Sequence, residues 1–379
     1  MRLDSPPQRR LTAVLHGRNG AGWTGGGQIM NPDSTAATKP VLIVPYVWIG
    51  DFVRCHSVVK LLQAQAPGRP VDIVSSTLCA PLADYMPGLR RVIVADLPRR
   101  RLGIARQREL AAKLRAGDYG QVLVMSRKWK AALAPWLAGI AVRTGFAGEV
   151  RIGLINDMRH GESQLPRMID QMGALALPKG ASLPAEWPLP ELKVPADAVK
   201  RWQMQRGLAD EPRPIVTLSP GAVGAGKAWP AGHYGQLAQA LAQDGASIWV
   251  LGGPNESALA AQIAQAGDQR VRDLTGNDLR DAILALAAAD VAVTNDSGLM
   301  HVSAAIGTPT IAIFGPTSPW HWKPLNPIAA ILEPPGDEAA RQRARNDGND
   351  AVAHRRTADV AVDSVLAKVR EVLKDAKKH

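Results

Sequence analysis

The stretch that decides the fold is Val293-Thr294-Asn295-Asp296-Ser297-Gly298-Leu299-Met300-His301, which runs on through residues 304–309 to Phe314-Gly315-Pro316-Thr317. The apolar, β-branched run at residues 291–293 predicts a buried strand of a parallel sheet. The polar turn after it predicts the start of a helix, which either Asn295 or Asp296 can cap. The whole stretch therefore predicts a strand, a turn, a helix and a second strand.

The turn at Ser297 and Gly298 has the features of a phosphate site. Gly298 lets a ligand approach the backbone closely. The first turn of a helix offers free N–H groups and the positive end of the helix dipole. His301 lies four residues after Ser297, so the two residues share one face of the helix. An ordinary connection, with Asp296 only as a cap and His301 as a surface residue, fits the turn equally well when it is taken alone.

Chain length and the spacing of apolar runs predict two α/β halves. A chain of 379 residues exceeds the usual size of one domain. In the first half, strands are expected at 41–44, 71–74, 92–94 and 122–124, and helices at 52–65, 102–116 and 130–137. In the second half, strands are expected at 215–218, 248–251, 271–274, 291–294 and 310–314, and helices at 233–243, 256–266, 279–288, 299–306 and 358–373. This alternation predicts two parallel sheets with right-handed crossovers.

The domain boundaries follow from this alternation. Residues 40–181 are expected to form one Rossmann-like domain and residues 215–335 a second, with the Pro-rich segment 182–214 as a linker. A polar segment and a final helix occupy 336–379. Residues 1–39 are rich in Gly, Pro and Arg and are expected to be disordered, with Met30 as an alternative start to Met1. Ligands bind at the carboxyl ends of parallel strands, so the site is expected between the two domains.

Composition excludes several classes of protein. The chain has two cysteines, Cys55 and Cys79, which rules out a disulfide scaffold and favours a reducing compartment. No Cys/His cluster has the spacing of a zinc site. No apolar run reaches the ~18 residues expected of a membrane-spanning helix.

The positive charge is concentrated in one region. The net charge is +11, and residues 90–130 contain 12 Lys/Arg against 3 Asp/Glu, a local +9 that leaves +2 for the rest of the chain. A solvated helix face explains part of this run, but a one-sided basic face also attracts anionic partners. The run lacks a nucleic-acid-binding module and has few aromatic residues to stack on bases. An acidic lipid surface or a phosphorylated, carboxylated sugar acceptor fits the charge equally well.

In each half, one loop follows the first strand. The second half has Ser219-Pro220-Gly221-Ala222-Val223-Gly224-Ala225-Gly226-Lys227-Ala228-Trp229-Pro230, in which the glycines expose N–H groups, Lys227 adds a positive charge and Pro230 opens a helix. It matches neither a Walker A loop nor a GxGxxG fingerprint, and a plain connecting loop is the alternative. The first half has Pro45-Tyr46-Val47-Trp48-Ile49-Gly50-Asp51, where Asp51 taken alone is compatible with a helix cap.

Together these strings resemble the ADP-heptose:lipopolysaccharide heptosyltransferase family, which are inverting sugar transferases of the GT-B fold (two Rossmann-like domains facing across a cleft). The similarity spans roughly residues 41–325. Arg143-Thr144-Gly145-Phe146 and residues 148–157 look like the stretch typical of heptosyltransferase II rather than heptosyltransferase I. After Pro324 the chain departs from the family pattern, because His354-Arg355-Arg356 stands without the cysteines that members often carry.

The resemblance implies an activity and a location. The donor would be ADP-L-glycero-D-manno-heptose, and the acceptor the lipopolysaccharide inner core, with the second heptose added to heptosyl-Kdo2-lipid A. The enzyme would act in the cytoplasm of a Gram-negative cell, peripherally at the anionic inner face of the inner membrane. No nucleic acid partner is expected. With a lysine and a helix dipole on the phosphates and no Asp-x-Asp motif, neither a metal nor another cofactor is expected to be required.

The resemblance also implies roles for particular residues. Asp51 and Lys227 are the expected catalytic residues, Asp51 as the general base and Lys227 as the group that neutralises the diphosphate. The remaining donor-binding residues are expected to be Gly221 and Ala222, through their backbone, and Asp296, Ser297, Gly298 and His301. The expected acceptor-binding residues are Trp48, Gly50, Arg127 and Lys128.

Three alternatives stay open at this point. A heptosyltransferase I-like enzyme would transfer the first heptose to Kdo. A nucleotide-sugar epimerase has the same twin-domain architecture, although the Asp-Ser-Gly-Leu-Met-His string and the Lys-x-Trp-Pro loop fit the transferases better. A binding module without activity is the third alternative, since a fold alone does not establish chemistry. A candidate base together with a phosphate lysine argues against that third alternative.

Overall fold

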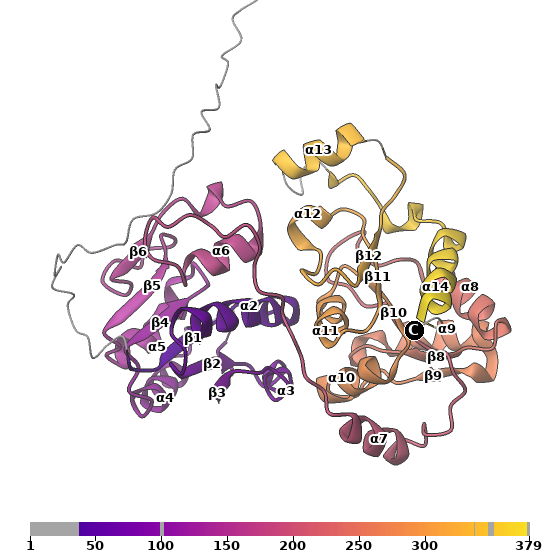
Figure 1. Cartoon of the computed structure of the whole chain (residues 1–379), viewed down its shortest axis with the longest axis horizontal. Helices are drawn as coiled ribbons and strands as arrows, with labels where there is room; N and C mark the ends of the chain where they lie inside the picture. The colour runs from indigo at the N-terminus through magenta and orange to yellow at the C-terminus, as the bar shows by residue number, and fades with distance from the viewer. Residues whose placement is uncertain (1–37, 99–101, 337, 348–351, 377–379) are drawn as a thin grey trace, which may run out of the picture. The chain divides into compact units, whose positions relative to one another are not determined.

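Two six-stranded sheets, each parallel throughout, form the framework of the chain (Figure 1). The computed structural model describes residues 38–98, 102–336, 338–347 and 352–376, and these residues belong to one unit by their contacts. The expectations for residues 1–37, including a start at Met30, lie outside the described residues, as do Arg99, Arg100 and Arg101.

Both sheets have the same strand order. The first is β3-β2-β1-β4-β5-β6 and the second is β9-β8-β7-β10-β11-β12. The strands of the first sheet are β1 (Val41–Val44), β2 (Val71–Ser75), β3 (Leu89–Val94), β4 (Gln121–Val124), β5 (Val142–Phe146) and β6 (Asp157–Arg159). Those of the second are β7 (Ile215–Ser219), β8 (Ser247–Val250), β9 (Val271–Asp273), β10 (Val291–Asn295), β11 (Thr310–Ile313) and β12 (Ala329–Leu332). This is the doubly wound order of a Rossmann-like domain, so each sheet has a switch point where the order reverses, between β1 and β4 or between β7 and β10.

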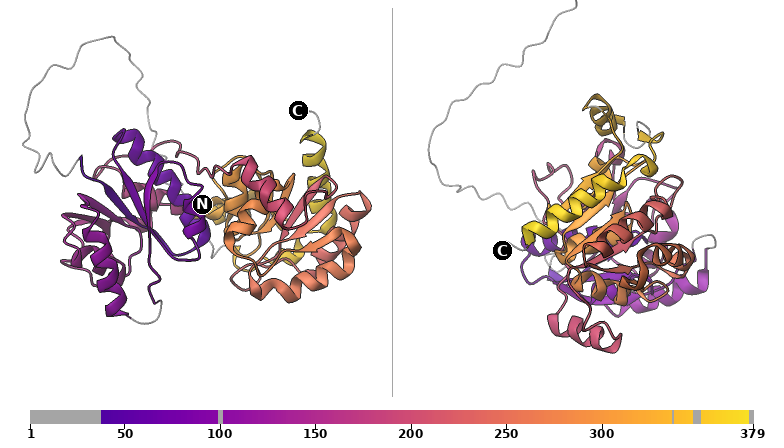
Figure 2. Two further views of the ribbon diagram at one scale, coloured as in Figure 1. Left: turned by 90° about the horizontal axis from the view of Figure 1, so that it is seen from below. Right: turned by 90° about the vertical axis from the view of Figure 1, so that its right-hand side faces the viewer.

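Helices cover both faces of the first sheet, as the left view of Figure 2 shows. The helices of the first half are α2 (Ile49–Gln65), α3 (Ala80–Ala83), α4 (Ile104–Arg115), α5 (Trp129–Leu137) and α6 (Met168–Ala174). Successive side chains of a strand point to opposite faces. Accordingly, Val41 and Ile43 of β1 pack with α2, whereas Leu42 and Val44 pack with α4 and α5. Because both faces are buried, β1 is apolar at every position.

The second sheet is built in the same way. Its helices are α8 (Ala231–Gln243), α9 (Ser257–Gly267), α10 (Leu279–Ala288), α11 (Gly298–Ile306), α12 (Pro319–Trp322), α13 (Glu338–Asp347) and α14 (Val362–Ala376). The last helix, α14, packs beside α8 and against β10 and β11 (Figures 1 and 2). Val365 and Val369 of α14 are fully buried in this contact, so the C-terminal helix completes the core of the second half.

The structure adds elements to two segments in which none was predicted. Residues 182–214, the expected linker, contain α7 (Ala196–Gln205), which packs on α10 and is anchored by the ring of Trp202 against Trp249. The polar segment after Pro324 contains β12, paired with β11, and α13. Both segments are Pro-rich or charged, and tertiary contacts rather than local preference fix their structure.

The starts of α2 and α11 approach each other so closely that only glycine fits. A Cβ atom added to Gly50 would lie 2.6 Å from Cδ2 of His301, and one added to Gly298 would lie 2.7 Å from Cβ of Ile49. Side chains at either position would push the two helices apart. Since α2 follows β1 and α11 follows β10, this contact joins the switch point of the first sheet to that of the second.

We predict that Gly298→Ala lowers the free energy of unfolding by about 1–3 kcal/mol, because the added methyl group meets the branched Cβ of Ile49. The matched control is Gly232→Ala in α8, where an added Cβ has no neighbour within 4 Å. That change is expected to stabilise the protein by about 0.4–1 kcal/mol. Urea unfolding of both variants tests the pair. A Gly298→Ala variant as stable as the parent would contradict the close helix contact.

Candidate active site

The residues singled out in the sequence lie at the two switch points. Asp51 follows β1, and Arg127 and Lys128 follow β4, which are the two strands at the switch point of the first sheet. Lys227 follows β7 and Asp296 follows β10, which are the corresponding strands of the second sheet. Ligands of doubly wound sheets bind in the crevice at such points, because the loops after the two strands diverge there.

The start of α11 differs from the expectation. The N-cap residue is Ser297, and its side chain makes no capping hydrogen bond. Neither Asn295 nor Asp296 caps the helix, so that prediction was wrong. Asn295 ends β10, and Asp296 points its carboxylate to Lys227 and Thr317 instead. The N–H groups in the first turn of α11 are therefore not occupied by a side-chain cap.

Asn295 holds the glycine-rich loop to the end of β10. Its side chain is fully buried, and its carbonyl oxygen accepts hydrogen bonds from the N–H of Trp229 and the hydroxyl of Tyr234, both at 3.1 Å. Its amide nitrogen donates to the carbonyl of Pro220 at 2.6 Å. One buried amide thus fixes both ends of the loop that contains Lys227. Sequence reasoning considered this residue only as a cap.

Lys227 and Asp296 form an ion pair in the second half of the site. The Nζ atom of Lys227 lies 2.6 Å from Oδ2 of Asp296, and the hydroxyl of Thr317 donates to the same oxygen at 2.6 Å. Gly224 and Gly226, with φ of 123° and 73°, give the loop the left-handed turns that bring Lys227 back toward β10. The pair places one positive and one negative group beside the start of α11.

The segment beyond α13 also supports this loop. The hydroxyl of Thr357 donates to the carbonyls of Gly226 and Ala228 at 3.1 and 2.7 Å. The indole of Trp229 donates to the carbonyl of Val360 at 2.9 Å. The C-terminal segment therefore pins the loop on both sides of Lys227.

The other expected backbone contacts lie at the beginning of the same loop. Gly221 and Ala222 are half-buried. A Cβ atom added to Gly221 would lie 3.0 Å from the side chain of Glu256, whose carboxylate accepts a hydrogen bond from the N–H of Gly253 at 2.8 Å. Gly221 thus lies against a carboxylate that the sequence analysis did not consider.

Asp51 lies in the first turn of α2, two residues beyond the helix start, and the N-cap residue is Trp48. The side chain of Asp51 is buried and its Oδ1 accepts a hydrogen bond from the Nη1 of Arg54 at 3.0 Å. Burial raises the pKa of Asp51, Arg54 opposes that rise, and the negative charge of Asp296 adds to it. No hydrogen bond to Oδ2 is found in the described part of the chain. Asp51 is therefore a buried carboxylate with one oxygen available, not a helix cap.

His301 packs between the two halves of the site. It is buried against Gly50, and burial lowers its pKa well below the usual range, with the positive charges of Arg54 and Lys227 adding to the effect. The imidazole is therefore neutral at neutral pH. A neutral ring can donate one hydrogen bond and accept another, which suits contact with hydroxyl groups or a phosphate.

Three of the four residues expected at the acceptor side lie together. Trp48, Arg127 and Lys128 line a cavity of about 960 Å³ at the carboxyl ends of the strands around β1 and β4. Its walls are largely apolar or aromatic, from Val44, Tyr46, Val47, Phe52, Leu78 and Leu97 among others. The fourth residue, Gly50, lies against His301, directly beside Asp51. Gly50 and Asp51 do not themselves line the cavity, although Trp48 and Phe52 on either side of them in the sequence do.

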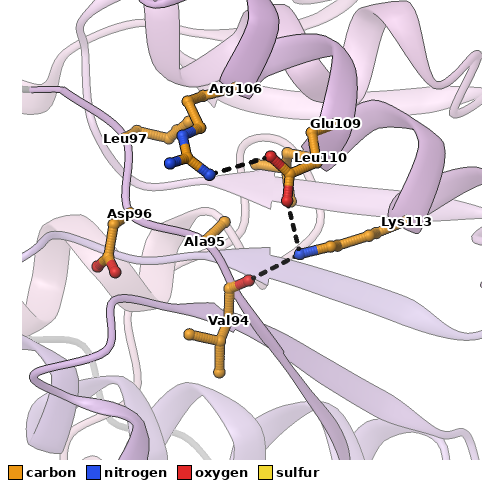
Figure 3. Close-up of a pocket in the computed structure, with 8 residues that line it drawn as sticks. All are labelled: Val94, Ala95, Asp96, Leu97, Arg106, Glu109, Leu110 and Lys113. Atoms are coloured by element: carbon orange, nitrogen blue, oxygen red, sulfur yellow. Dashed lines mark hydrogen bonds and ion pairs between the residues drawn. The ribbon is translucent and has the colours of Figure 1, made fainter.

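Ion pairs neutralise part of the basic run at residues 90–130. Figure 3 shows Glu109 between Arg106 and Lys113, pairing with both at 3.2 Å beside a pocket of about 160 Å³. The two arginines at the start of β3, Arg90 and Arg91, pair with the buried Asp72 of β2. Arg127 and Lys128 pair with Glu162 and Glu149 at the cavity. Several of the described cations of this region are therefore paired with carboxylates.

The described residues contain no group of three or more His, Cys, Asp or Glu side chains that could hold a metal ion. Both cysteines are buried thiols. Across the described helices, none combines the length and the apolar character needed to cross a bilayer.

Comparison with known proteins identifies the class. The model of glycosyltransferase family 9 (heptosyltransferase) matches residues 107–352. The chain belongs to this family, and it is a glycosyltransferase.

Two relatives that align with most of this chain are heptosyltransferases 2. Lipooligosaccharide heptosyltransferase 2 of Haemophilus influenzae is 32% identical over 346 residues, which cover 88% of this chain and 99% of that protein. Lipopolysaccharide heptosyltransferase 2 of Escherichia coli is 34% identical over 304 residues, which cover 77% of this chain and 87% of that protein. The structure of the ADP-heptose lipopolysaccharide heptosyltransferase II of E. coli aligns with a TM-score of 0.78 and 31% identity, covering 89% of this chain and 99% of that one. These matches confirm the prediction of two Rossmann-like domains of the GT-B type.

Proposed function

We propose that this enzyme transfers L-glycero-D-manno-heptose from ADP-heptose to the lipopolysaccharide inner core with inversion, adding the second heptose to heptosyl-Kdo2-lipid A. One observation carries the proposal. The contact between the starts of α2 and α11 brings Asp51, a buried carboxylate with a free oxygen, next to the helix start and lysine that suit a diphosphate. The similarity to heptosyltransferases 2 supplies the donor and the acceptor.

The mechanism follows from how charge develops in the reaction. As ADP leaves, its diphosphate gains negative charge, and the sugar becomes oxocarbenium-like. The ammonium group of Lys227 and the N–H groups at Ser297 and Gly298 would stabilise the diphosphate. Preorganised donors of this kind are each worth about 3 kcal/mol in comparable oxyanion sites. To reach the diphosphate, Lys227 would exchange its contact with Asp296, which then becomes available to hydroxyl groups of the heptose, together with the neutral His301.

Asp51 would act from the opposite side of the sugar. Its free Oδ2 would take the proton of the acceptor hydroxyl as that oxygen attacks the anomeric carbon, which inverts the configuration. General-base assistance contributes roughly 10²–10⁴-fold to a rate. The acceptor would occupy the cavity beside Trp48, where Arg127 and Lys128 can attract its phosphates and carboxylates. Because the lysine and the helix start supply the positive charge, we propose that turnover requires no metal ion.

An acceptor assay tests the proposed function against its alternatives. Purified protein with ADP-heptose is expected to release ADP and add one heptose, read by mass, to heptosyl-Kdo2-lipid A but not to Kdo2-lipid A. The same yield is expected in the presence of EDTA. Transfer to Kdo2-lipid A alone would favour a heptosyltransferase I-like role, and epimerised sugar without any acceptor would favour an epimerase. Loss of activity with EDTA would refute the metal-independent mechanism.

Substitution of the two proposed catalytic residues should separate chemistry from donor binding. Asp51→Asn is expected to lower kcat at least 10²-fold while ADP binding stays intact, because the base is lost and the donor contacts are not. Lys227→Met is expected to weaken ADP binding. The exposed Asp197 of α7, changed to Asn, serves as the control and should leave both properties unchanged.

The pH profile of the parent enzyme also tests Asp51 as the general base, and it needs no substitution. The base must be ionised, and burial raises the pKa of Asp51. Activity should therefore fall with decreasing pH along a limb that lies above the ~3.9 of an ordinary aspartate. Wild-type turnover in Asp51→Asn would remove this residue from the role of base.

We also propose that the enzyme associates peripherally with anionic membranes through its basic first half. The support is the charge of residues 90–130, of which Arg108 is exposed on α4 and Lys128 on the cavity rim. Binding to vesicles that contain phosphatidylglycerol should fall steeply as NaCl is raised, since exposed charges are screened. Salt-insensitive binding, or none to anionic vesicles at low salt, would contradict this proposal.

A further inference from the structure

Arg54 is a buried arginine one helical turn beyond Asp51 on α2. Its side chain is 4% exposed, so its guanidinium is removed from solvent. Nη1 donates to Oδ1 of Asp51 at 3.0 Å, and Nη2 donates to the backbone carbonyl of Trp322. The guanidinium carbon also lies 5.5 Å from the centre of the Trp322 ring, within the range of a cation–π contact. The two partners of Arg54 come from opposite halves of the chain.

The arginine restricts what the carboxylate of Asp51 can do. A carboxylate can present either oxygen by rotating about its last bond, and burial without a partner favours the protonated form. The planar fork of Arg54 binds Oδ1 on one arm and a backbone carbonyl on the other, so the guanidinium cannot rotate without losing one of them. Fixing Oδ1 in this way leaves Oδ2 as the oxygen without a partner.

The segment that holds Arg54 continues to the donor side of the site. Trp322 ends α12, which begins at Pro319, directly after the loop containing Thr317. The hydroxyl of Thr317 bonds to Asp296, which pairs with Lys227. An unbroken series of contacts therefore runs from Lys227 through Asp296, Thr317 and α12 to Arg54 and Asp51.

We propose that Arg54, anchored on α12 through Trp322, is a positioning residue that sets the orientation and the ionised state of the Asp51 carboxylate. This inference rests on the proposed function, in which Asp51 is the general base. In this role Arg54 acts through Asp51 and not by binding a substrate. Through α12, Arg54 makes the geometry of the base depend on the loop that contacts the donor site.

Two substitutions separate the charge of Arg54 from its geometry. Arg54→Gln removes the charge, so the acid limb of kcat/KM should move to higher pH by about 1–3 units, the effect of removing an opposite charge at this distance. The direction follows because Arg54 lowers the pKa of Asp51. Arg54→Lys keeps the charge but cannot reach both partners. Its acid limb should stay within about half a unit of the parent's, while kcat falls about 10- to 100-fold. The KM for ADP-heptose should change little in either variant.

Arg143→Gln is the matched control. Arg143 is also partly buried and donates to the backbone carbonyls of Ile140, Leu154 and Gly153, so its loss should lower the melting temperature. The acid limb of this control should not move. ADP binding and thermal unfolding show which variants are folded, and Arg54→Lys carries the test if Arg54→Gln does not fold.

Two results would overturn the inference without touching the proposed function. One is an active parent enzyme together with Arg54 variants that keep the parent's kcat. The other is a shift of the acid limb in Arg143→Gln equal to that in Arg54→Gln, which would mean that any loss of stability moves the profile. By contrast, if the parent enzyme shows no acceptor-dependent release of ADP, the proposed function itself is contradicted.

Discussion

The close approach of two helix starts is the constraint on which the site depends. Gly50 of α2 lies against His301, and Gly298 of α11 lies against Ile49, so each helix contributes a glycine to the contact. The positive ends of both helix dipoles, together with the cations Arg54 and Lys227, meet the carboxylates Asp51 and Asp296 in this small volume. Each cation pairs with a carboxylate, which offsets the cost of burying Asp51, Arg54 and Asp296 beside the partly buried Lys227. The packing of α2 against α11 thereby holds the candidate base, Asp51, beside the proposed diphosphate site.

In the second half of the site, hydrogen bonds hold the glycine-rich loop from two sides, β10 and the C-terminal segment. Asn295 ties the loop to β10, Thr357 ties it to the C-terminal segment, and the indole of Trp229 bonds to Val360. The bonds from Asn295 and Thr357 satisfy backbone groups of the loop, at Trp229 and Gly226, that would otherwise lack these partners. Lys227 is then free to exchange a single ion pair for a ligand while its backbone stays in place. The first half instead offers a large, mostly apolar cavity, which suits an amphiphilic acceptor better than a small anion.

Much of the fold could be predicted because the two sheets are buried on both faces. Their strands are short, continuous apolar runs, and β1, β4, β7 and β10 were found within one or two residues. The elements that were missed stand in segments rich in proline or charge: α7 lies in the Pro-rich segment 182–214 and packs on α10, and the short strand β12 lies beyond Pro324 and pairs with β11. The fold class and the family were confirmed, whereas the domain boundaries and the roles of individual residues stay predictions.

The candidate site was predicted in part for the same reason. Asp51, Lys227, Asp296 and Gly298 stand in recognisable strings at strand ends, so their placement followed from the alternation of strands and helices. Arg54 reads in the sequence as one more residue of a helix, since its partner Trp322 is 268 positions away. The prediction that Asn295 can cap the helix was wrong, because in the sequence a polar side chain at the end of a strand is as compatible with a helix cap as with a hydrogen bond to another loop.

The central claim, that α2 and α11 are held together at Gly50 and His301, can be measured in a double-mutant cycle of unfolding free energies. A methyl group at position 50 would meet the imidazole ring and little else within 3.4 Å. The account predicts that Gly50→Ala destabilises the parent protein by about 1–3 kcal/mol, but destabilises a His301→Ala background much less, since the smaller side chain leaves room. Strictly additive effects of the two substitutions would contradict the account.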